Sequence, residues 1–434
     1  MIQTGLIPNA HSDLVTDAAY DFYGLRLATC GLDQRIKVWH LDEANGAWNV
    51  EDDWKAHDAT ISKLSWAHPE FGSILASASF DRTVKVWEQA APGLNDQQNG
   101  HNGSSSGPSS SRWVERAVLM DARGTVRAVE FAPHHFGLKL ATISSDNVLR
   151  IYECLEQPTL SSWQLLEEID VANVAPGPSP AHVSRVQTLA LATPTQTNVA
   201  LDAPHASLVA QALQQSLPPS RHALANREAD GGWTLSWCKD RYWGEIIAVG
   251  AGTSGVVKII QLNSRRSNVL LALEPSTSSG GATGGLHQSG GAHSSAAGGA
   301  GAGEQNSQQM FAVTSVSWAP SCGRSYHLVA TGSRDGKVRV WKLKPPPEEM
   351  GEEDGQDDAR WTANAVADFD HHKSAVGRVE WNVTGTVLSS AGNDGKVRLW
   401  KATVGNVWRT AGSIGVEQAS EESKNDSKDV EMGN

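Results

Sequence analysis

Five segments of this sequence repeat one arrangement of apolar and polar residues. Each has an apolar run, a short polar turn, and then alternating apolar and basic residues that end in an aromatic side chain. Alternation with a period of two is typical of a β-strand, and a turn between two such runs predicts an antiparallel hairpin. The five segments are LATCGLDQRIKVW, LASASFDRTVKVW, LATISSDNVLRIY, VATGSRDGKVRVW and LSSAGNDGKVRLW.

Three residue types keep constant offsets in all five segments. An Asp stands six residues before the final aromatic, in the pairs Asp33 and Trp39, Asp81 and Trp87, Asp146 and Tyr152, Asp335 and Trp341, and Asp394 and Trp400. A hydroxyl residue precedes each Asp by four positions, at Thr29, Ser77, Thr142, Thr331 and Ser390. A base precedes each aromatic by two positions, at Lys37, Lys85, Arg150, Arg339 and Arg398. Self-similarity of this kind predicts a repeat architecture.

A further strand is predicted upstream of each hairpin. It ends in an aromatic residue, at Tyr20, Trp66, Phe131, Trp318 and Trp381, and in three copies a His precedes that aromatic by nine residues, at His11, His57 and His372. A sixth, degraded copy spans residues 233–262. There Trp237, Lys258 and Ile260 occupy the places of the upstream aromatic, the base and the final aromatic, but the Asp is missing. We therefore count six repeats.

These offsets resemble the WD-repeat family, so the expected fold is an all-β propeller of six blades. The resemblance implies that a buried hydrogen-bond chain of His, Ser or Thr, Asp and Trp holds the blades. In the second repeat, Asp81 would orient His57, His57 would meet Ser77, and Ser77 would meet the indole N–H of Trp87. The residues named above at these four positions are the expected structural network.

Longer strings narrow the resemblance. Residues 66–88, 126–153, 323–331 and 381–402 are similar to the Seh-one family, the Sec-thirteen homologue among the nucleoporins. The ending LRIYE of the third repeat and the stretch WNVTGTVL fit this family better than the paralogous coat protein Sec-thirteen. The resemblance implies a non-enzymatic scaffold in the outer ring, or Y complex, of the nuclear pore. It also implies a place in the SEA or GATOR coat, which regulates TOR signalling at the vacuole or lysosome.

One domain, residues 1–415, holds all six repeats, with blades at about 11–55, 56–120, 121–170, 232–273, 309–365 and 366–415. Stretches without periodicity that are rich in Gly, Ser, Pro, Gln or acids are expected to be disordered insertions, at 92–111, 171–231, 274–308 and 343–360. An acidic disordered tail is expected at 416–434. Length alone is compatible with six or seven blades of about 40 to 45 residues, and the counted motifs favour six.

The two ends of the repeat array predict a ring that this chain leaves open. A closed ring commonly completes its last blade with a strand from the N-terminus. The residues before His11 contain Pro8 and Asn9, which make a poor ladder strand, and the sixth repeat has its own final strand around Trp408. Exposed flanks on the first and last blades favour either aggregation or a partner. We expect a partner.

The family resemblance implies that this partner is an α-helical nucleoporin of the Nup-eighty-five type, which inserts a blade in trans. The apolar residues Ile2, Leu6 and Ile7 are candidate partner-binding residues, because they have no internal mate in this interpretation. The alternative is a closed propeller that recruits peptides through its surface, as a COPII-type coat subunit or another WD-repeat adaptor.

Charge and composition exclude several classes of protein. The formal net charge is −12, and ten of those negative charges belong to residues 345–360 and 416–434. The remainder is nearly neutral and has no basic face for nucleic acid. No apolar run reaches the ~18 residues of a membrane-spanning helix, and the first residues do not resemble a signal peptide. Four dispersed cysteines without a CxxC pair argue against a zinc site or disulfides, and they favour a reducing compartment, cytosol or nucleus.

Motifs that resemble active sites have simpler explanations. Gly250, Gly252 and Gly255 form GxGxxG, but a β-branched stretch follows where a dinucleotide site needs a helix. The His-Asp-Ser set recurs in several repeats, whereas a hydrolase needs one placed constellation. The His pairs at 134–135 and 371–372 would point to opposite faces of a strand, which does not suit a metal site. We expect no enzyme activity, cofactor or metal. The acidic stretch 348–358 is either a solvated loop or a docking tail for a basic partner.

Overall fold

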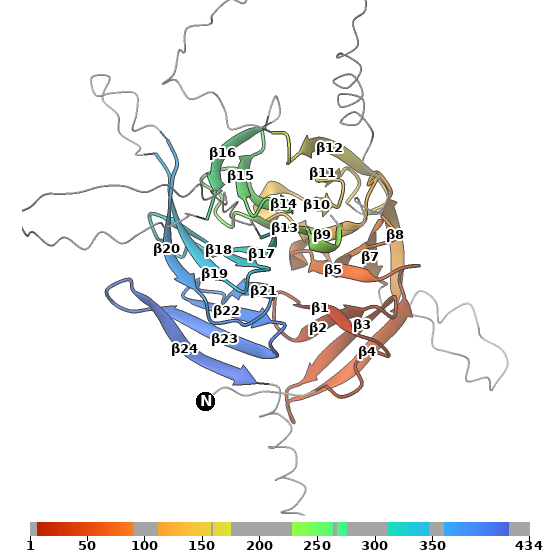
Figure 1. Ribbon diagram of the computed structural model, residues 1–434. Coiled ribbons are helices and arrows are strands. Elements are labelled where there is room, and N and C mark those ends of the chain that lie inside the picture. The colour runs from red at the N-terminus through yellow and green to blue at the C-terminus, as the bar shows by residue number, and fades with distance from the viewer. Residues whose placement is uncertain are drawn as a thin grey trace, which may run out of the picture.

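The computed structural model describes residues 7–90, 112–157, 159–174, 228–263, 267–275, 311–346 and 360–415. In this part of the chain, twenty-four strands form six antiparallel sheets of four strands each. Every sheet consists of four consecutive strands, and the sheets stand around a common centre like the blades of a propeller (Figure 1). The expected all-β propeller of six blades is confirmed.

The strands of each blade follow one another from the centre of the ring outward. Blade 1 contains β1 (Val15–Tyr20), β2 (Arg26–Gly31), β3 (Arg35–Asp42) and β4 (Ala47–Lys55). Blade 2 contains β5 (Ile61–Trp66), β6 (Ile74–Ser79), β7 (Val84–Gln89) and β8 (Trp113–Leu119). Blade 3 contains β9 (Val126–Phe131), β10 (Lys139–Ser144), β11 (Val148–Cys154) and β12 (Trp163–Asp170).

The second half of the ring has the same order. Blade 4 contains β13 (Gly232–Trp237), β14 (Ile246–Gly252), β15 (Val257–Gln261) and β16 (Asn268–Leu273). Blade 5 contains β17 (Val313–Trp318), β18 (His327–Ser333), β19 (Val338–Lys344) and β20 (Thr362–Phe369). Blade 6 contains β21 (Val376–Trp381), β22 (Val387–Gly392), β23 (Lys396–Ala402) and β24 (Trp408–Gly415). A 3-10 helix, Pro69–Phe71, lies between β5 and β6 of blade 2, and a second one, His134–Phe136, lies between β9 and β10 of blade 3.

The repeated Asp sits in the turn between the second and third strands of a blade. The carboxylate of Asp81 accepts a hydrogen bond of 2.9 Å from the backbone N–H of Thr83, and the equivalent bond joins Asp335 to Lys337 at 2.9 Å. The residue after each Asp has a positive φ, for example 82° at Gly336. An Asx turn followed by a left-handed residue reverses the chain tightly, so this Asp is first of all a turn residue.

Buried apolar clusters join neighbouring blades. Ile36 and Val38 of blade 1 belong to one cluster with Leu64 and Leu75 of blade 2, and four further clusters join blades 2 and 3, 3 and 4, 4 and 5, and 5 and 6. In each cluster, apolar side chains from the second and third strands of one blade pack against apolar and aromatic side chains of the next blade. Among the described residues, no such cluster joins blade 6 to blade 1.

Two expected segment boundaries differ from the structure. Strand β20 crosses the division placed between residues 365 and 366, and residues 343 and 344 belong to β19 rather than to an insertion. The pairing of β19 with β20 runs from Val338↔Phe369 to Lys344↔Thr362. β20 is an outermost strand with mostly exposed Ala and polar residues, so its sequence lacks the alternation that reveals inner strands. Most of the expected insertions and the tail lie outside the described residues.

The described residues include no helix with the length and apolar character needed to cross a bilayer.

Candidate interaction site at the open junction of the ring

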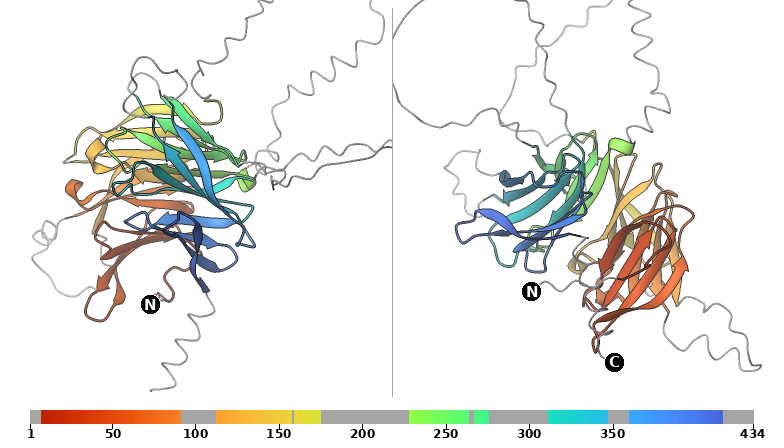
Figure 2. Two further views of the ribbon diagram at one scale, coloured as in Figure 1. Left: turned by 90° about the vertical axis from the view of Figure 1, so that its left-hand side faces the viewer. Right: turned by 60° about the horizontal axis from the view of Figure 1, so that its bottom comes forward.

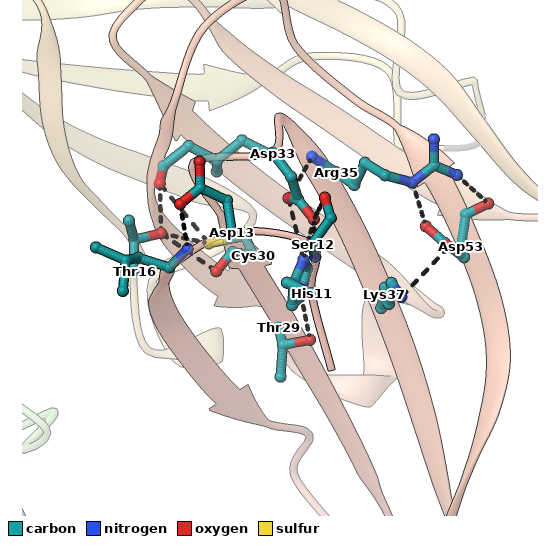
Figure 3. A network of polar contacts seen from close by, with 12 residues as sticks. His11, Ser12, Asp13, Thr16, Thr29, Cys30, Asp33, Arg35, Lys37 and Asp53 are labelled. Atoms are coloured by element: carbon teal, nitrogen blue, oxygen red, sulfur yellow. Dashed lines mark hydrogen bonds and ion pairs between the residues drawn. The ribbon is translucent and has the colours of Figure 1, made fainter. Parts of the chain in front are cut away.

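The structure brings together the predicted polar network in blades 1, 2 and 6. In blade 2, the Nδ1 of His57 lies 2.8 Å from Asp81, its Nε2 lies 2.7 Å from the Ser77 hydroxyl, and the Trp87 indole donates to that hydroxyl at 2.9 Å. Blade 1 repeats the arrangement with His11, Thr29, Asp33 and Trp39, as Figure 3 shows for its His, Thr and Asp. Blade 6 repeats it with His372, Ser390, Asp394 and Trp400.

Blade 5 has only part of this network. The Trp341 indole donates to the Thr331 hydroxyl at 3.0 Å, as in the other blades. Asp335, however, pairs with Arg339 at 3.2 Å and accepts a hydrogen bond from the Ser333 hydroxyl. Here the base of the repeat takes the place of the histidine beside the carboxylate.

Blade 3 departs from the expected network, and this corrects the pairing of Thr142 with Tyr152. The Tyr152 hydroxyl donates to Asp121 at 3.0 Å, and no hydrogen bond among the described residues joins it to Thr142. Asp146 pairs with Arg150 at 2.9 Å. A phenol reaches farther than an indole N–H, so the same offset in sequence places its donor beside a different acceptor.

In blade 4, the repeat lacks its Asp, and the base of the repeat contacts the chain after blade 3 instead. The ammonium of Lys258 donates to the carbonyl oxygens of Val171 at 2.6 Å and Val174 at 2.8 Å. Burial lowers the pKa of Lys258, because the ammonium has exchanged water for these neutral acceptors. This contact holds blade 4 against the end of blade 3.

Electrostatics in the network stabilise the turns. Burial alone would raise the pKa of Asp81, but hydrogen bonds from His57 and Thr83 outweigh it and leave the pKa well below its usual range. The same balance holds the pKa of Asp33 low beside His11. The arrangement recurs from blade to blade and lies inside the sheets, so it satisfies buried polar groups rather than forming one reactive centre.

The other candidate chemistry does not assemble into a site. Gly250 and Gly252 end strand β14, and β15 follows Gly255 where a dinucleotide fold needs a helix. His134 and His135 lie in a 3-10 helix, and His371 and His372 lie between β20 and β21, which corrects the expected place of both pairs on strands. Within the described ranges, no three His, Cys, Asp or Glu side chains are grouped to hold a metal ion.

A polar cavity of about 570 Å³ occupies the centre of the ring. Several of its charged lining residues are paired across blades, with Lys63 2.9 Å and Arg378 2.6 Å from the buried carboxylate of Asp17, and Lys239 bonded to Glu130. Arg378 belongs to blade 6 and Asp17 to blade 1, so this ion pair joins the two ends of the repeat array at the inner edge of the ring. In the described part of the chain, the apolar packing found at the other five junctions does not continue outward from this ion pair.

Blade 6 exposes the face that every other blade buries against its neighbour. Val397 is 38% exposed and Leu399 is partly exposed. The residues at the position of Val397 in blades 1 to 5 are buried, each at most 2% exposed: Ile36, Val84, Leu149, Val257 and Val338. Those at the position of Leu399 are buried too: Val38, Val86, Ile151, Ile259 and Val340. The last blade therefore presents an apolar face without its next neighbour.

Blade 1 is exposed on the opposing side of the same junction. Val15 is 48% exposed and Tyr20 is 60% exposed. Their counterparts at the start and end of the first strand are buried in blade 5 as Val313 and Trp318. Figures 1 and 2 place blade 6 beside blade 1. We call the faces that carry Val397 and Leu399, and Val15 and Tyr20, the open junction.

Of the candidate partner-binding residues, Ile2 and Leu6 lie outside the described residues. Ile7 is described and partly buried. The exposed residues of the open junction were missed by sequence reasoning, because Val397 matches its buried counterparts in type and position.

Comparisons with known proteins decide the family. A family model described as WD domain, G-beta repeat matches residues 4–40, 49–88, 306–342 and 363–401. Nucleoporin SEH1 of Saccharomyces cerevisiae is 32% identical over 439 residues, which cover 94% of this chain and 99% of that protein. The chain belongs to the Seh1 nucleoporin family.

Further members of the Seh1 family match over a similar length. Nucleoporin SEH1 of Homo sapiens is 32% identical over 408 residues, covering 93% of this chain and 86% of that protein. The solved structure of Chaetomium thermophilum Sqt1 bound to the N-terminus of the ribosomal protein L10 covers 94% of this chain and 76% of that chain, with a TM-score of 0.50. At 17% identity, this likeness shows the propeller fold alone.

Proposed function

We propose that this Seh1-family chain is a non-enzymatic scaffold subunit of the nuclear pore outer ring, the Y complex, and that an α-helical nucleoporin binds it by placing a blade in the open junction. The observation that carries the proposal is the exposure of Val397 and Leu399, whose counterparts are buried in five other blades. The relatives are named nucleoporins, and the name supports the pore as the place of assembly.

The chemistry of the open junction favours a β-structured occupant. Both flanking faces are sheet surfaces with apolar side chains, with Val397 and Leu399 at alternate positions of β23 and Val15 and Tyr20 at the two ends of β1. A sheet inserted between them would bury the apolar groups of both faces, at roughly 25 cal/mol for each Å² of apolar surface removed from water. A strand-bearing segment at the end of a helical partner provides such a sheet, which is a form of recognition by strand addition.

The resemblance also supports a second assembly, the SEA or GATOR coat in TOR signalling. In this proposal the chain serves nucleocytoplasmic transport, mRNA transport included, at the nuclear envelope and acts as a peripheral subunit at the vacuole or lysosome surface. Both assemblies would use the same open junction, because the helical partner in each would have to complete the same ring.

Affinity purification of the tagged full-length chain from its own cells, followed by mass spectrometry, tests the proposal. We expect α-helical nucleoporins among the co-purifying proteins. The double variant Val397→Asp, Leu399→Asp should recover them about tenfold less well, because it places charges where apolar surface is buried on binding.

The matched control is Val404→Asp, which changes a fully exposed residue of the loop between β23 and β24. It should recover the partner as the parent does. Substituting Ile2, Leu6 and Ile7 by Asp should also weaken the complex without unfolding the repeats, and an unchanged dissociation constant would remove them from the interface. The proposal fails if the junction variant binds as tightly as Val404→Asp.

A further inference from the structure

The junction of blades 5 and 6, unlike the open junction, is closed by apolar packing. A cavity of about 230 Å³ opens there. Its wall includes three bases, two aromatic residues and an aliphatic side chain: Arg324, Lys342, Lys401, Tyr326, Trp408 and Leu328. No Asp or Glu is among its lining residues. The cavity is smaller than the roughly 300–1,000 Å³ of small-molecule sites, so its size fits one or two side chains of a peptide.

The positive charges of this pocket have no counter-ion in the described part of the chain. No ion pair with a carboxylate involves Lys342, Lys401 or Arg324 there. Lys401 stands directly opposite Arg409 on the neighbouring strand, and like charges in that position repel. On a chain with a net charge of −12, three unneutralised bases in one cavity, with Arg409 beside Lys401, favour the binding of an anion there.

Aromatic rings orient the cations without neutralising them. The ammonium of Lys342 lies 3.9 Å from the centre of the Tyr326 ring, and the guanidinium carbon of Arg324 lies 5.9 Å from the same centre. Trp408 packs edge to face on Trp381 with ring centres 5.5 Å apart. Cation–π contacts of this kind hold the positive groups in place while their charge stays available to a ligand.

The wall of the pocket is rigid. Arg324 of blade 5 donates to the carbonyl oxygen of Gly385 in blade 6 at 2.8 Å and to that of Pro320. Gly385 has a φ of 61°, and a Cβ at this position would lie 2.5 Å from the Pro320 oxygen. A glycine is needed here for the two blades to approach, and the contact fixes the pocket before a ligand arrives, which reduces the entropic cost of binding.

We propose that the pocket between blades 5 and 6 binds an acidic peptide segment of a partner protein, with one apolar side chain in the cavity and flanking carboxylates on Lys342 and Lys401. Charge complementarity identifies the ligand class, and the cavity volume limits it to a short segment. Apart from Lys401, which lies on the same strand as Val397 and Leu399, the site belongs to a different junction from the proposed blade-binding faces, so a partner could occupy both at once. Such bivalent binding would raise the overall affinity.

Fluorescence anisotropy of the full-length chain with a labelled peptide tests this inference. The probe is a peptide with a central Leu flanked on both sides by Asp and Glu. Its controls replace the acids by Asn and Gln, or the Leu by Gly. We expect saturable binding of the acidic probe that weakens with added salt, and weaker binding of both control peptides.

The charge-reversal variant Lys342→Glu, Lys401→Glu should weaken binding of the acidic probe by about tenfold or more. The matched control, Lys373→Glu with Lys396→Glu, makes the same change in net charge at exposed residues of blade 6 outside the pocket, and it should bind the probe within about twofold of the parent. Circular dichroism melts of the two variants check that both remain folded.

Each measurement is repeated on a variant in which the seven acids of residues 348–358 are replaced by Gln or Asn, so that the chain's own acidic stretch cannot compete. Absence of binding by the acidic probe in both backgrounds would overturn the inference. Equal weakening by the two lysine variants, or equal binding of the neutral peptide, would overturn it as well.

Discussion

Asp81 has two tasks in its blade, and both depend on its negative charge. One oxygen accepts from the backbone N–H of Thr83, which closes the turn, and the other lies 2.8 Å from His57. His57 in turn meets Ser77, which accepts from the Trp87 indole. Removing the carboxylate leaves the turn N–H of Thr83 without its acceptor, and it leaves the Nδ1 of the buried His57 with only the Thr83 hydroxyl, at 3.2 Å.

Asp81→Ala should therefore lower the free energy of unfolding by about 1–3 kcal/mol. Urea denaturation of the full-length chain measures the change. The matched control is Asp58→Ala, because Asp58 is next to His57 but its side chain is 91% exposed; it should stay within about 0.5 kcal/mol of the parent. An Asp81→Ala curve that coincides with the parent curve would refute the assigned role.

The histidine of blade 6 predicts a dependence of stability on pH. Burial lowers the pKa of His372, and the charge of Arg398, whose Nη1 lies 2.6 Å from His372 Nδ1, opposes protonation further. The folded-state pKa is thus below the unfolded value of about 6.5. The stabilisation is complete above that value and is lost as the pH falls toward the folded-state pKa.

We expect the free energy of unfolding to fall between about pH 7.5 and pH 5.5, and to fall less in a His372→Gln variant. Glutamine cannot be protonated and keeps an amide that can bond Ser390. Urea denaturation at the two pH values gives both differences. Identical losses in the parent and in the variant would show that His372 does not contribute.

The sequence predicted the contacts of the polar network well in the blades whose repeats contain all four residue types, His, Ser or Thr, Asp and Trp. His11, His57 and His372 each occupy the expected position, because equal offsets in equal strands place equal side chains together. In blade 3, whose repeat lacks the His, the expected contact of Tyr152 was wrong, because its hydroxyl donates to Asp121. The spacing in the sequence sets the backbone position of a side chain. It does not determine which acceptor a longer side chain reaches.

At the scale of elements, the position of a strand in the ring decides whether its apolar residues are buried. Val338 in β19 and Val397 in β23 are equivalent in their blades and identical in type. Val338 is fully buried against blade 6, whereas Val397 is 38% exposed. The difference arises because blade 5 has a packed neighbour on this side and blade 6 does not.

Substituting each of these valines by Asp gives a matched pair. Val338→Asp should destabilise the chain by several kcal/mol or prevent folding, because it buries an unpaired charge. Val397→Asp should change the free energy of unfolding by less than about 1 kcal/mol, since its carboxylate can remain hydrated. Thermal and urea melts compare the two. Equal destabilisation would mean that Val397 is packed in solution and that the open junction does not exist.

Inner strands and hairpins were predictable, whereas outermost strands were not. The Asp-Gly turns at 335–336 and 394–395 have the positive φ that their composition requires. The predicted boundary falls inside β20, because its exposed Ala and polar residues show no periodic pattern by which the strand could be recognised. Hydrophobic periodicity reports burial on one face, so a strand with little burial leaves little trace in the sequence.

At the scale of the whole molecule, the six repeats predicted the number of blades and the ends of the array predicted exposed flanks, while the arrangement of clusters adds which residues form those flanks. Five apolar clusters join five pairs of neighbours, and at the sixth junction Arg378 of blade 6 contacts blade 1 through its ion pair with Asp17 and a hydrogen bond to the Ala18 carbonyl oxygen. Which valine lacks a neighbour depends on where the ring begins and ends, and that is a property of the three-dimensional arrangement.

A cryo-electron microscopy structure of the complex purified from cells through a tag on this chain tests the central claim most directly. The account predicts strands of a second polypeptide between the two faces of the open junction, in contact with Val15 and Tyr20 on one side and Val397 and Leu399 on the other. A seventh sheet built from this chain's own residues in that position would contradict it. So would a partner bound elsewhere while these four side chains stay exposed to water.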